Sequence, residues 1–174
     1  DALLIWRELG LTGRSGLALS LDLVGELATE EGDYAHAPAY FQEALQIYRE
    51  LGDIRGASDI PMQFGWAAMR LGDYAQATVY LEEFLELAQA ANDITNIAFA
   101  CSGLGEVAIR QGDYVRAESL LNQSLSLNRS RGDQWGVGTV LGSLGWVALR
   151  RRDFKIMRAY LTESLTVRLK LRDR

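Results

Sequence analysis

Few side chains in this sequence of 174 residues could carry out covalent or metal chemistry. The chain has one histidine, His36, and one cysteine, Cys101. A serine or cysteine nucleophile needs a base beside it, but His36 stands between two alanines at a position that we expect to face the solvent. Cys101 lies at an inward-facing position of a predicted helix, so we interpret it as a buried, unreactive thiol. The sequence therefore predicts no catalytic site, no multi-histidine metal site and no internal disulfide.

One glycine-rich stretch has the composition of a phosphate-binding loop. Gly136, Gly138 and Gly142 are closely spaced, yet no strand pattern precedes them and they fall inside a predicted helix. The chain also lacks the Gly-Lys-Ser or Gly-Lys-Thr sequence of a P-loop. We therefore expect no nucleotide or other cofactor.

The composition is that of a globular chain with an acidic balance. Hydrophobic residues make up 48% and charged residues 24% of the chain, which is enough to bury a core, and the formal net charge is -5. A general nucleic-acid binder needs a basic surface, so the charge argues against that class. No apolar run approaches the roughly 18 residues that span a bilayer, and no charged-then-apolar leader precedes the pattern described next. We therefore expect no membrane partner and a cytoplasmic location.

A repeat with a period of 40 residues runs along the whole chain. The tripeptide Gly-Asp-Tyr occurs at residues 32–34, 72–74 and 112–114, and Arg-Asp-Phe follows at 152–154. Two further sets recur at the same spacing: Gly25, Gly65, Gly105 and Gly145, and Ala28, Ala68, Ala108 and Ala148. This recurrence predicts one supersecondary unit that is copied four times.

Each unit contains two helical segments joined by tight turns. In the first unit, apolar residues follow a helical period over about 16–31 and again over 33–51. An aspartate precedes most of these segments, where its carboxylate can accept a hydrogen bond from a free backbone N–H. The short gaps require neighbouring helices to pack antiparallel. No segment has the sustained alternation of a strand, so the expected fold class is all-α.

The four recurring glycines carry the most specific expectation. Glycine inside a helix costs about 1 kcal/mol relative to alanine, so a glycine kept at one phase needs an offsetting gain. We expect that gain to be close approach of the paired helix. The residues that would press against the bare backbone are Phe41, Leu81, Leu121 and Leu161.

The unit resembles a tetratricopeptide repeat, in which a Leu-Gly pair in the first helix is followed by small and bulky residues in the second. The pair reads Val24-Gly25, Phe64-Gly65, Leu104-Gly105 and Leu144-Gly145, and the first small residue reads Ala37, Ala77, Ala117 and Met157. The period exceeds the family's usual period of about 34 residues, and the proline that closes each unit is absent. This longer form is similar to the arrays of Pins-type adaptors and to the sensor regions of bacterial STAND-type signalling ATPases. The preference for arginine over lysine favours the bacterial case.

The resemblance implies a right-handed superhelical solenoid of antiparallel helix pairs. We interpret residues 1–174 as a single array and as a fragment of a longer protein. The second helix of a preceding repeat would lie at 1–10, before repeats at 14–52, 53–92, 93–132 and 133–174. Because apolar residues recur along 155–171, we expect further repeats to follow, and exposed ends of the fragment could pair end to end.

The resemblance also implies that the first helices line a concave groove that binds a protein or peptide partner. The positions that match the ligand-contacting positions of the family are Asp22, Glu26, Glu30, Asp59, Met62, Trp66, Met69, Arg70, Phe99, Ser102, Glu106, Arg110, Thr139, Trp146 and Arg150. Tryptophan, methionine and arginine are enriched at binding surfaces, and arginines could hold carboxylates by forked hydrogen bonds. The competing interpretation is that the tryptophans fill the packing between repeats and that the arginines pair with neighbouring carboxylates.

We therefore predict a non-catalytic binding scaffold, the sensor or adaptor segment of a larger signalling protein. Two alternatives stay open: a structural spacer or self-association module without a groove ligand, and a helical-repeat RNA binder, which the acidic balance disfavours.

Two local features add to this prediction. Pro61 lies in the middle of a first helix, where it either kinks the helix and reshapes the groove or is a tolerated defect. Nine basic and three acidic side chains give residues 145–174 a net charge of +6. That charge could meet an acidic neighbour, a phosphate or nucleic acid, or it could be a solvated end.

Overall fold

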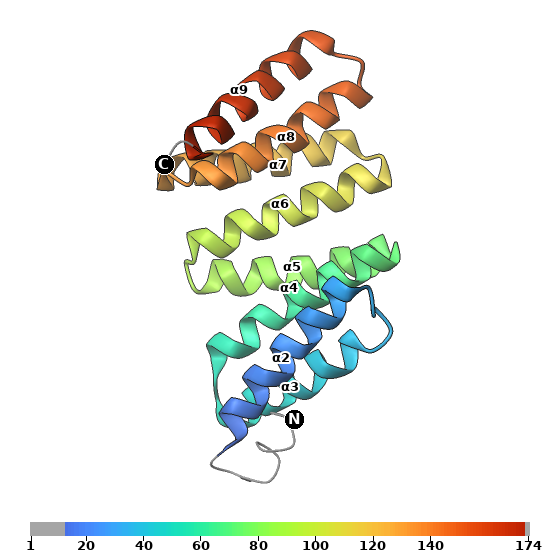
Figure 1. The fold of residues 1–174 in the computed structure, drawn as a ribbon, viewed down its shortest axis with the longest axis vertical. Helices are drawn as coiled ribbons and strands as arrows, with labels where there is room; N and C mark the ends of the chain where they lie inside the picture. The colour runs from blue at the N-terminus through green and yellow to red at the C-terminus, as the bar shows by residue number, and fades with distance from the viewer. Residues whose placement is uncertain (1–12, 173–174) are drawn as a thin grey trace. The chain divides into compact units, whose positions relative to one another are not determined.

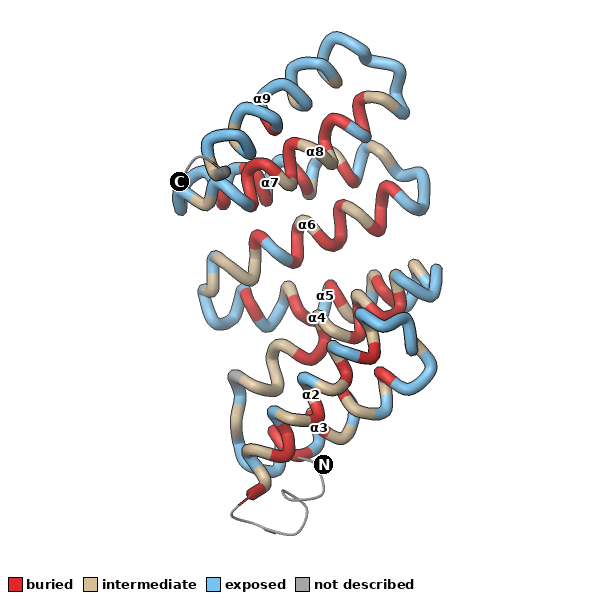
Figure 2. The backbone as a smooth tube through the Cα atoms, viewed as in Figure 1, coloured by how far each residue is buried: buried red, intermediate tan, exposed pale blue. Residues whose placement is uncertain are grey.

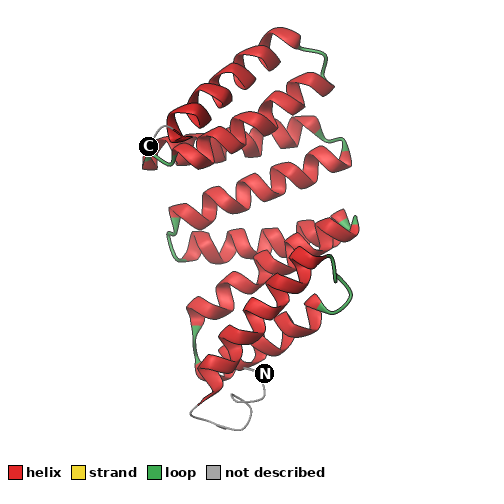
Figure 3. Cartoon of the chain, viewed as in Figure 1, coloured by secondary structure: helices red, strands yellow, loops and turns green. Residues whose placement is uncertain are grey.

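The computed structural model describes residues 13–172, and every regular element in this range is an α-helix (Figures 1 and 3). The helices are α2 (Arg14–Glu31), α3 (Ala37–Leu51), α4 (Ile54–Leu71), α5 (Tyr74–Ala90), α6 (Ile94–Gln111), α7 (Tyr114–Arg131), α8 (Gln134–Arg150) and α9 (Phe154–Arg172). The predicted all-α fold class is confirmed. The helix expected at 1–10 and the last two residues of the final repeat lie outside the described range. Within that range, none of the helices combines the length and the hydropathy needed to cross a membrane.

The helices form two compact units, Asp1–Phe84 and Leu85–Arg174, and the boundary between them falls within α5. In the first unit α2 packs on α3 and α3 packs on α4. In the second unit α6 packs on α7, α7 on α8, and α8 on α9. First helices of neighbouring repeats also touch, since α2 contacts α4 and α6 contacts α8. Each unit is therefore a stack of antiparallel helices in chain order.

Aspartates begin α4 to α9 as predicted, whereas α2 begins after Gly13 and α3 after His36. The carboxylate of Asp113 accepts a hydrogen bond from the backbone N–H of Arg116 at 3.0 Å, at the start of α7. The same contact, to the residue three positions further on, is made by Asp53, Asp73, Asp93, Asp133 and Asp153. The turns before these aspartates need a left-handed backbone, which falls on glycine except at Asn92, between α5 and α6, and at Arg152, between α8 and α9.

The turn before α3 differs from the prediction of a helix that starts near residue 33. α3 begins at Ala37, because residues 34–36 form a separate turn. Nδ1 of His36 lies 2.8 Å from Oδ1 of Asp33, and this hydrogen bond lowers the pKa of Asp33. Pro38 occupies the first turn of α3, where the missing N–H is tolerated. His36 is thus an exposed residue that precedes the helix rather than part of it.

Each recurring glycine lies against the bulky residue of its paired helix, which confirms the expectation of close approach. An ideal Cβ atom on any of these glycines would lie closer than 3 Å to that side chain, a separation that real Cβ atoms do not show. The pairs and nearest distances are Gly25–Phe41 (2.5 Å), Gly65–Leu81 (2.7 Å), Gly105–Leu121 (2.8 Å) and Gly145–Leu161 (2.7 Å).

Buried residues recur along the helices of each unit (Figure 2) and form its core. In the first unit Phe64 meets Phe41 edge to face, with ring centroids 5.7 Å apart, and stacks on Tyr80 at 5.0 Å. In the second unit the hydroxyl group of Ser124 donates a hydrogen bond to the carbonyl of Ala98 at 2.8 Å. This bond satisfies a polar group that is fully buried between α6 and α7.

The helix that contains Pro61 is not interrupted. α4 runs from Ile54 to Leu71 with Pro61 buried in its interior. The kink and the reshaped groove that were considered for this residue stay predictions.

Candidate functional site

The second unit has a pocket between α6 and α8 with a volume of about 500 Å³. The residues that line it are Glu106, Ile109 and Arg110 from α6, and Gly142, Ser143, Trp146 and Arg150 from α8. Residues four apart on a helix share a face, so Glu106 and Arg110 form one wall while Trp146 and Arg150 form the other. The structure thus brings together four of the residues that the sequence assigned to the groove.

The two arginines of this pocket differ in their partners. The Nε atom and one terminal nitrogen of Arg110 both lie 3.1 Å from Oε1 of Glu106. Arg150 has no carboxylate partner within the described part of the chain, and its guanidinium carbon lies 5.5 Å from the centroid of the Trp146 ring. A cation over an aromatic face is attracted by the ring quadrupole but keeps its hydrogen-bond donors. Arg150 therefore offers charge and donors to a ligand, whereas Glu106 offsets the charge of Arg110.

The pocket combines this cation with apolar surface. Trp146 is 48% exposed, so much of its ring is open to a ligand. Ile109 is buried at the base of the same pocket. An apolar plane beside a free guanidinium suits a ligand that carries an apolar side chain next to a carboxylate.

The corresponding face of the first unit is acidic. Burial, followed by the charges of Glu26 and Asp59, raises the pKa of Asp22 to about 6. Oδ1 of Asp22 is buried without a hydrogen-bond partner in the described residues. Gln63 of α4 donates a hydrogen bond to Glu26 of α2. This face would repel a carboxylate, so the two units do not offer the same chemistry.

The remaining predicted groove residues divide by burial. Half-buried side chains are Met62, Trp66, Met69, Ser102 and Thr139, and exposed ones are Glu30, Arg70 and Phe99. These residues fall in both compact units, and a continuous groove that joins them stays a prediction. The competing interpretation was that the arginines pair with neighbouring carboxylates. It holds for Arg110, which pairs with Glu106, but not for Arg150, which lies over Trp146.

The two side chains considered for catalysis have the environments expected of non-catalytic residues. His36 is exposed and bonded to Asp33. Cys101 is fully buried, and burial raises the pKa of its thiol to about 11, which leaves little thiolate near neutral pH. Between residues 13 and 172, no group of three or more His, Cys, Asp or Glu side chains is placed to hold a metal ion.

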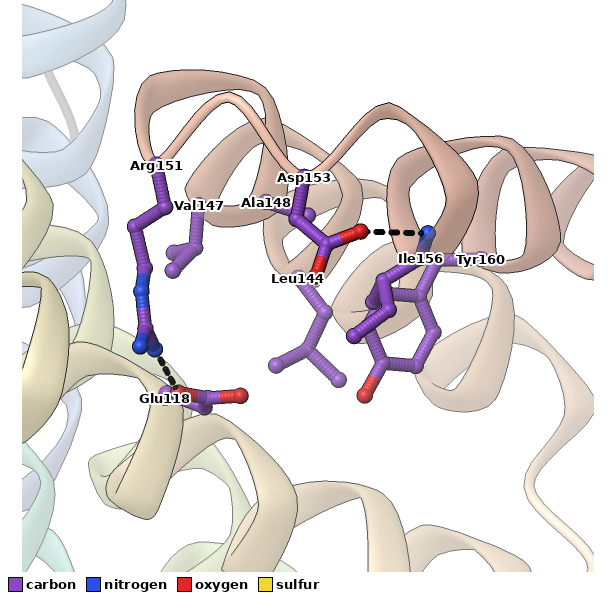
Figure 4. Close-up of a pocket in the computed structure, with 8 residues that line it drawn as sticks. All are labelled: Glu118, Leu144, Val147, Ala148, Arg151, Asp153, Ile156 and Tyr160. Atoms are coloured by element: carbon purple, nitrogen blue, oxygen red, sulfur yellow. Dashed lines mark hydrogen bonds and ion pairs between the residues drawn. The ribbon is translucent and has the colours of Figure 1, made fainter.

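A second pocket, of about 260 Å³, lies where α8 turns into α9 (Figure 4). Leu144 and Val147 of α8 provide apolar walls, and Tyr160 of α9 points into the space between them and Glu118. Glu118 of α7 forms an ion pair with Arg151, which closes one side. The charges here are already matched, so this pocket offers a ligand less than the pocket beside Trp146.

Sequence reasoning did not find the second pocket or the part that Ser143 plays in the first. The arginine run that contains Arg151 was visible, but nothing in the sequence links Arg151 to Glu118 on another helix. A comparison of the repeats would not have marked Tyr160, because tyrosine also occupies the equivalent positions 40 and 80.

Two stretches of the chain, residues 63–130 and 96–170, match the family model described as tetratricopeptide repeat. The matches overlap and together cover more than half of the chain. The chain belongs to the tetratricopeptide repeat family. This confirms the resemblance inferred from the repeated Leu-Gly positions. No curated protein matches this tetratricopeptide repeat chain.

Solved structures share its fold at low sequence identity. The crystal structure of BtubC (BKLC) from P. vanneervenii has a TM-score of 0.82 and 20% identity, over 97% of this chain and 70% of that one. The apo form of RapI has a TM-score of 0.81 and 16% identity, over 90% of this chain and 57% of that one. A Rap protein complexed with Competence and Sporulation Factor has a TM-score of 0.83 and 18% identity, over 91% of this chain and 44% of that one. These likenesses establish a helical-repeat fold, and this tetratricopeptide repeat chain spans only part of each Rap protein.

Proposed function

We propose that this tetratricopeptide repeat chain is a non-catalytic scaffold that binds a protein or peptide partner, as the sensor or adaptor segment of a signalling protein. The observation that carries the proposal is Arg150, which lies over the half-exposed ring of Trp146 in an open pocket and has no carboxylate partner in the described residues. An unpaired guanidinium beside an aromatic plane is typical of an anchor point for a partner.

The pocket favours a peptide segment with a carboxylate next to an apolar side chain. The carboxylate would accept forked hydrogen bonds from Arg150, and the apolar side chain would lie on Trp146 above Ile109. Glu106 limits the charge of the site, so a polyanion such as RNA has no basic track to follow at this face. In the first unit, the acidic residues around Asp22 likewise leave no basic track for RNA.

The comparisons support a binding role in outline. The repeats of this family are generally non-catalytic scaffolds, and one similar structure is a Rap protein complexed with Competence and Sporulation Factor. The partner chemistry and the signalling context rest on the pocket and on the resemblance to sensor and adaptor arrays.

Tryptophan fluorescence tests the proposal. In a chain carrying Trp6→Phe, Trp66→Phe and Trp135→Phe, emission reports on Trp146 alone. Short synthetic peptides that end in a free carboxylate after Leu or Phe would be titrated, with the amidated peptides as matched controls. We expect saturable change with the free acids, and affinity at least about fivefold weaker for the amides, because a charged hydrogen bond contributes about 1 kcal/mol or more.

Two arginine variants test whether peptide binding depends on Arg150. Arg150→Gln should weaken binding, whereas Arg131→Gln, which removes an exposed arginine at the end of α7, should not. Equal responses to the free and amidated peptides would contradict the carboxylate assignment. No saturable response to any peptide would favour the spacer alternative.

A further inference from the structure

The last helix exposes apolar residues at positions that are buried one repeat earlier. Leu121 and Leu125 of α7 are 0% and 4% exposed, whereas the equivalent Leu161 and Leu165 of α9 are 44% and 58% exposed. Leu161 makes the same contact with Gly145 that Leu121 makes with Gly105. The difference therefore arises on the opposite side, where α8 covers α7 and the described residues place nothing over α9. Figure 2 shows that most of α9 is exposed.

The first described helix has the complementary feature. Leu19, Leu23 and Leu27 are each more than half exposed, and their spacing of four places them on one face of α2. In the later repeats the residues equivalent to Leu27 are buried, and one of them, Val147, is only 2% exposed. Val147 belongs to the same hydrophobic cluster as Leu121 and Leu125. Leu27 thus occupies a position that packs on the second helix of a preceding repeat, whereas Phe99, which is equivalent to Leu19, is 43% exposed.

The two exposed faces also carry opposite charge. Residues 13–31 contain four acidic side chains and one basic side chain, a net charge of -3. Residues 154–172, which form α9, contain five basic side chains and one acidic side chain, a net charge of +4. Association of one face with the other is favoured by charge, whereas pairing of two copies of the basic face is opposed by it.

We propose that the α2 face of one copy of this chain docks on the α9 face of a second copy, in the way that α8 packs on α7 within the chain. Leu27 of one copy would then lie against Leu161 and Leu165 of the other, as Val147 lies in one cluster with Leu121 and Leu125. The contact is heterologous, because it joins two different surfaces. Each added copy leaves one α2 face and one α9 face free, so the assembly grows in steps of one chain.

Sedimentation equilibrium of the 174-residue chain over a wide concentration range tests this inference. The chain mass is 19.3 kDa. We expect the weight-average mass to rise past twice that value as concentration increases, and the rise to weaken in high salt. A chain that stays monomeric at all concentrations, or a mass that levels off at a dimer, would overturn the proposal.

Variants in which one face is blocked test whether the contact joins the α2 face of one copy to the α9 face of another. Leu27→Asp and Leu165→Asp each leave one face intact, so each variant alone should remain at the mass of one chain. An equimolar mixture should form a dimer and nothing larger. Val115→Asp, at a residue of α7 that is 74% exposed, is the matched control and should associate like the parent chain. Circular dichroism establishes that every variant keeps its helical content.

Failure of this proposal is separable from failure of the proposed function. If either single variant still associates, or if the mixture stays monomeric, head-to-tail docking is wrong. Peptide binding beside Trp146 is measured by fluorescence on chains at low concentration, and neither blocked face includes a residue of that pocket.

Discussion

The side chain of Leu121 lies directly against the backbone of Gly105, where an ideal Cβ atom would be 2.8 Å from Cγ of Leu121. The glycine is therefore needed for the distance between α6 and α7, not for its backbone freedom. The same relationship joins Gly145 to Leu161 in the next helix pair.

Gly105→Ala should destabilise the chain, although alanine has the higher helix propensity. The added methyl forces Leu121 or a helix to move, and such overpacking costs about 1–3 kcal/mol, more than the about 1 kcal/mol that alanine contributes to a helix. Urea unfolding measures the free energy of unfolding. Gly142→Ala is the matched control, because its nearest neighbour would be 4.0 Å away, and it should stabilise the chain. A gain in stability at both positions would contradict the close-approach argument.

Arg152→Gly should stabilise the turn between α8 and α9. Arg152 has a φ of 59°, in the left-handed region, whereas glycine occupies the equivalent position in the earlier turns. Relief of this strain should raise the free energy of unfolding by about 1 kcal/mol. Arg152→Ala removes the same charge without relieving the strain, so it separates the backbone effect from electrostatics. A thermal melt in which the alanine and glycine variants coincide would assign the effect to charge.

Asp22→Asn should stabilise the chain at neutral pH and not in acid. The pKa of Asp22 is raised from 3.8 to about 6 in the folded chain, so ionisation destabilises the fold as pH rises through that interval. Removing the ionisable group should add about 1 kcal/mol above pH 6, after allowance for solvent screening, and the gain should disappear below pH 3.8. Urea unfolding at several pH values measures this. Glu31→Gln, at an exposed residue, should show no such pH dependence.

Glu106→Gln should tighten the binding of carboxylate peptides at the pocket beside Trp146. The substitution releases Arg110 from its 3.1 Å contact and removes a negative charge that faces the ligand. We expect affinity to rise severalfold, since a surface charge pair contributes up to about 1 kcal/mol. The fluorescence titration with free and amidated peptides measures it. A similar gain for the amidated peptides would show that Glu106 acts on something other than the ligand's carboxylate.

The sequence by itself determined the helices, their aspartate caps and the glycine contacts. These features depend on interactions between residues that are close in the chain or that recur at a fixed offset, so one pattern specifies them all. The exception is the turn at His36, where the hydrogen bond from its ring to Asp33 and the following Pro38 delay the start of α3. Helix propensity and hydrophobic periodicity do not predict such a local side-chain hydrogen bond.

Only the tertiary structure decided which groove positions meet in one pocket. Arg110 pairs with Glu106 and Arg150 lies over Trp146, and each partner stands four residues earlier on the same helix, so these contacts are local. The packing of α6 on α8 is what places the two pairs on facing walls of the same pocket. The burial of Asp22 and the exposure of Leu165 follow in the same way from which helix covers which face. The position of a residue in the repeat sets the place of its backbone, and tertiary packing determines which other residues its side chain contacts.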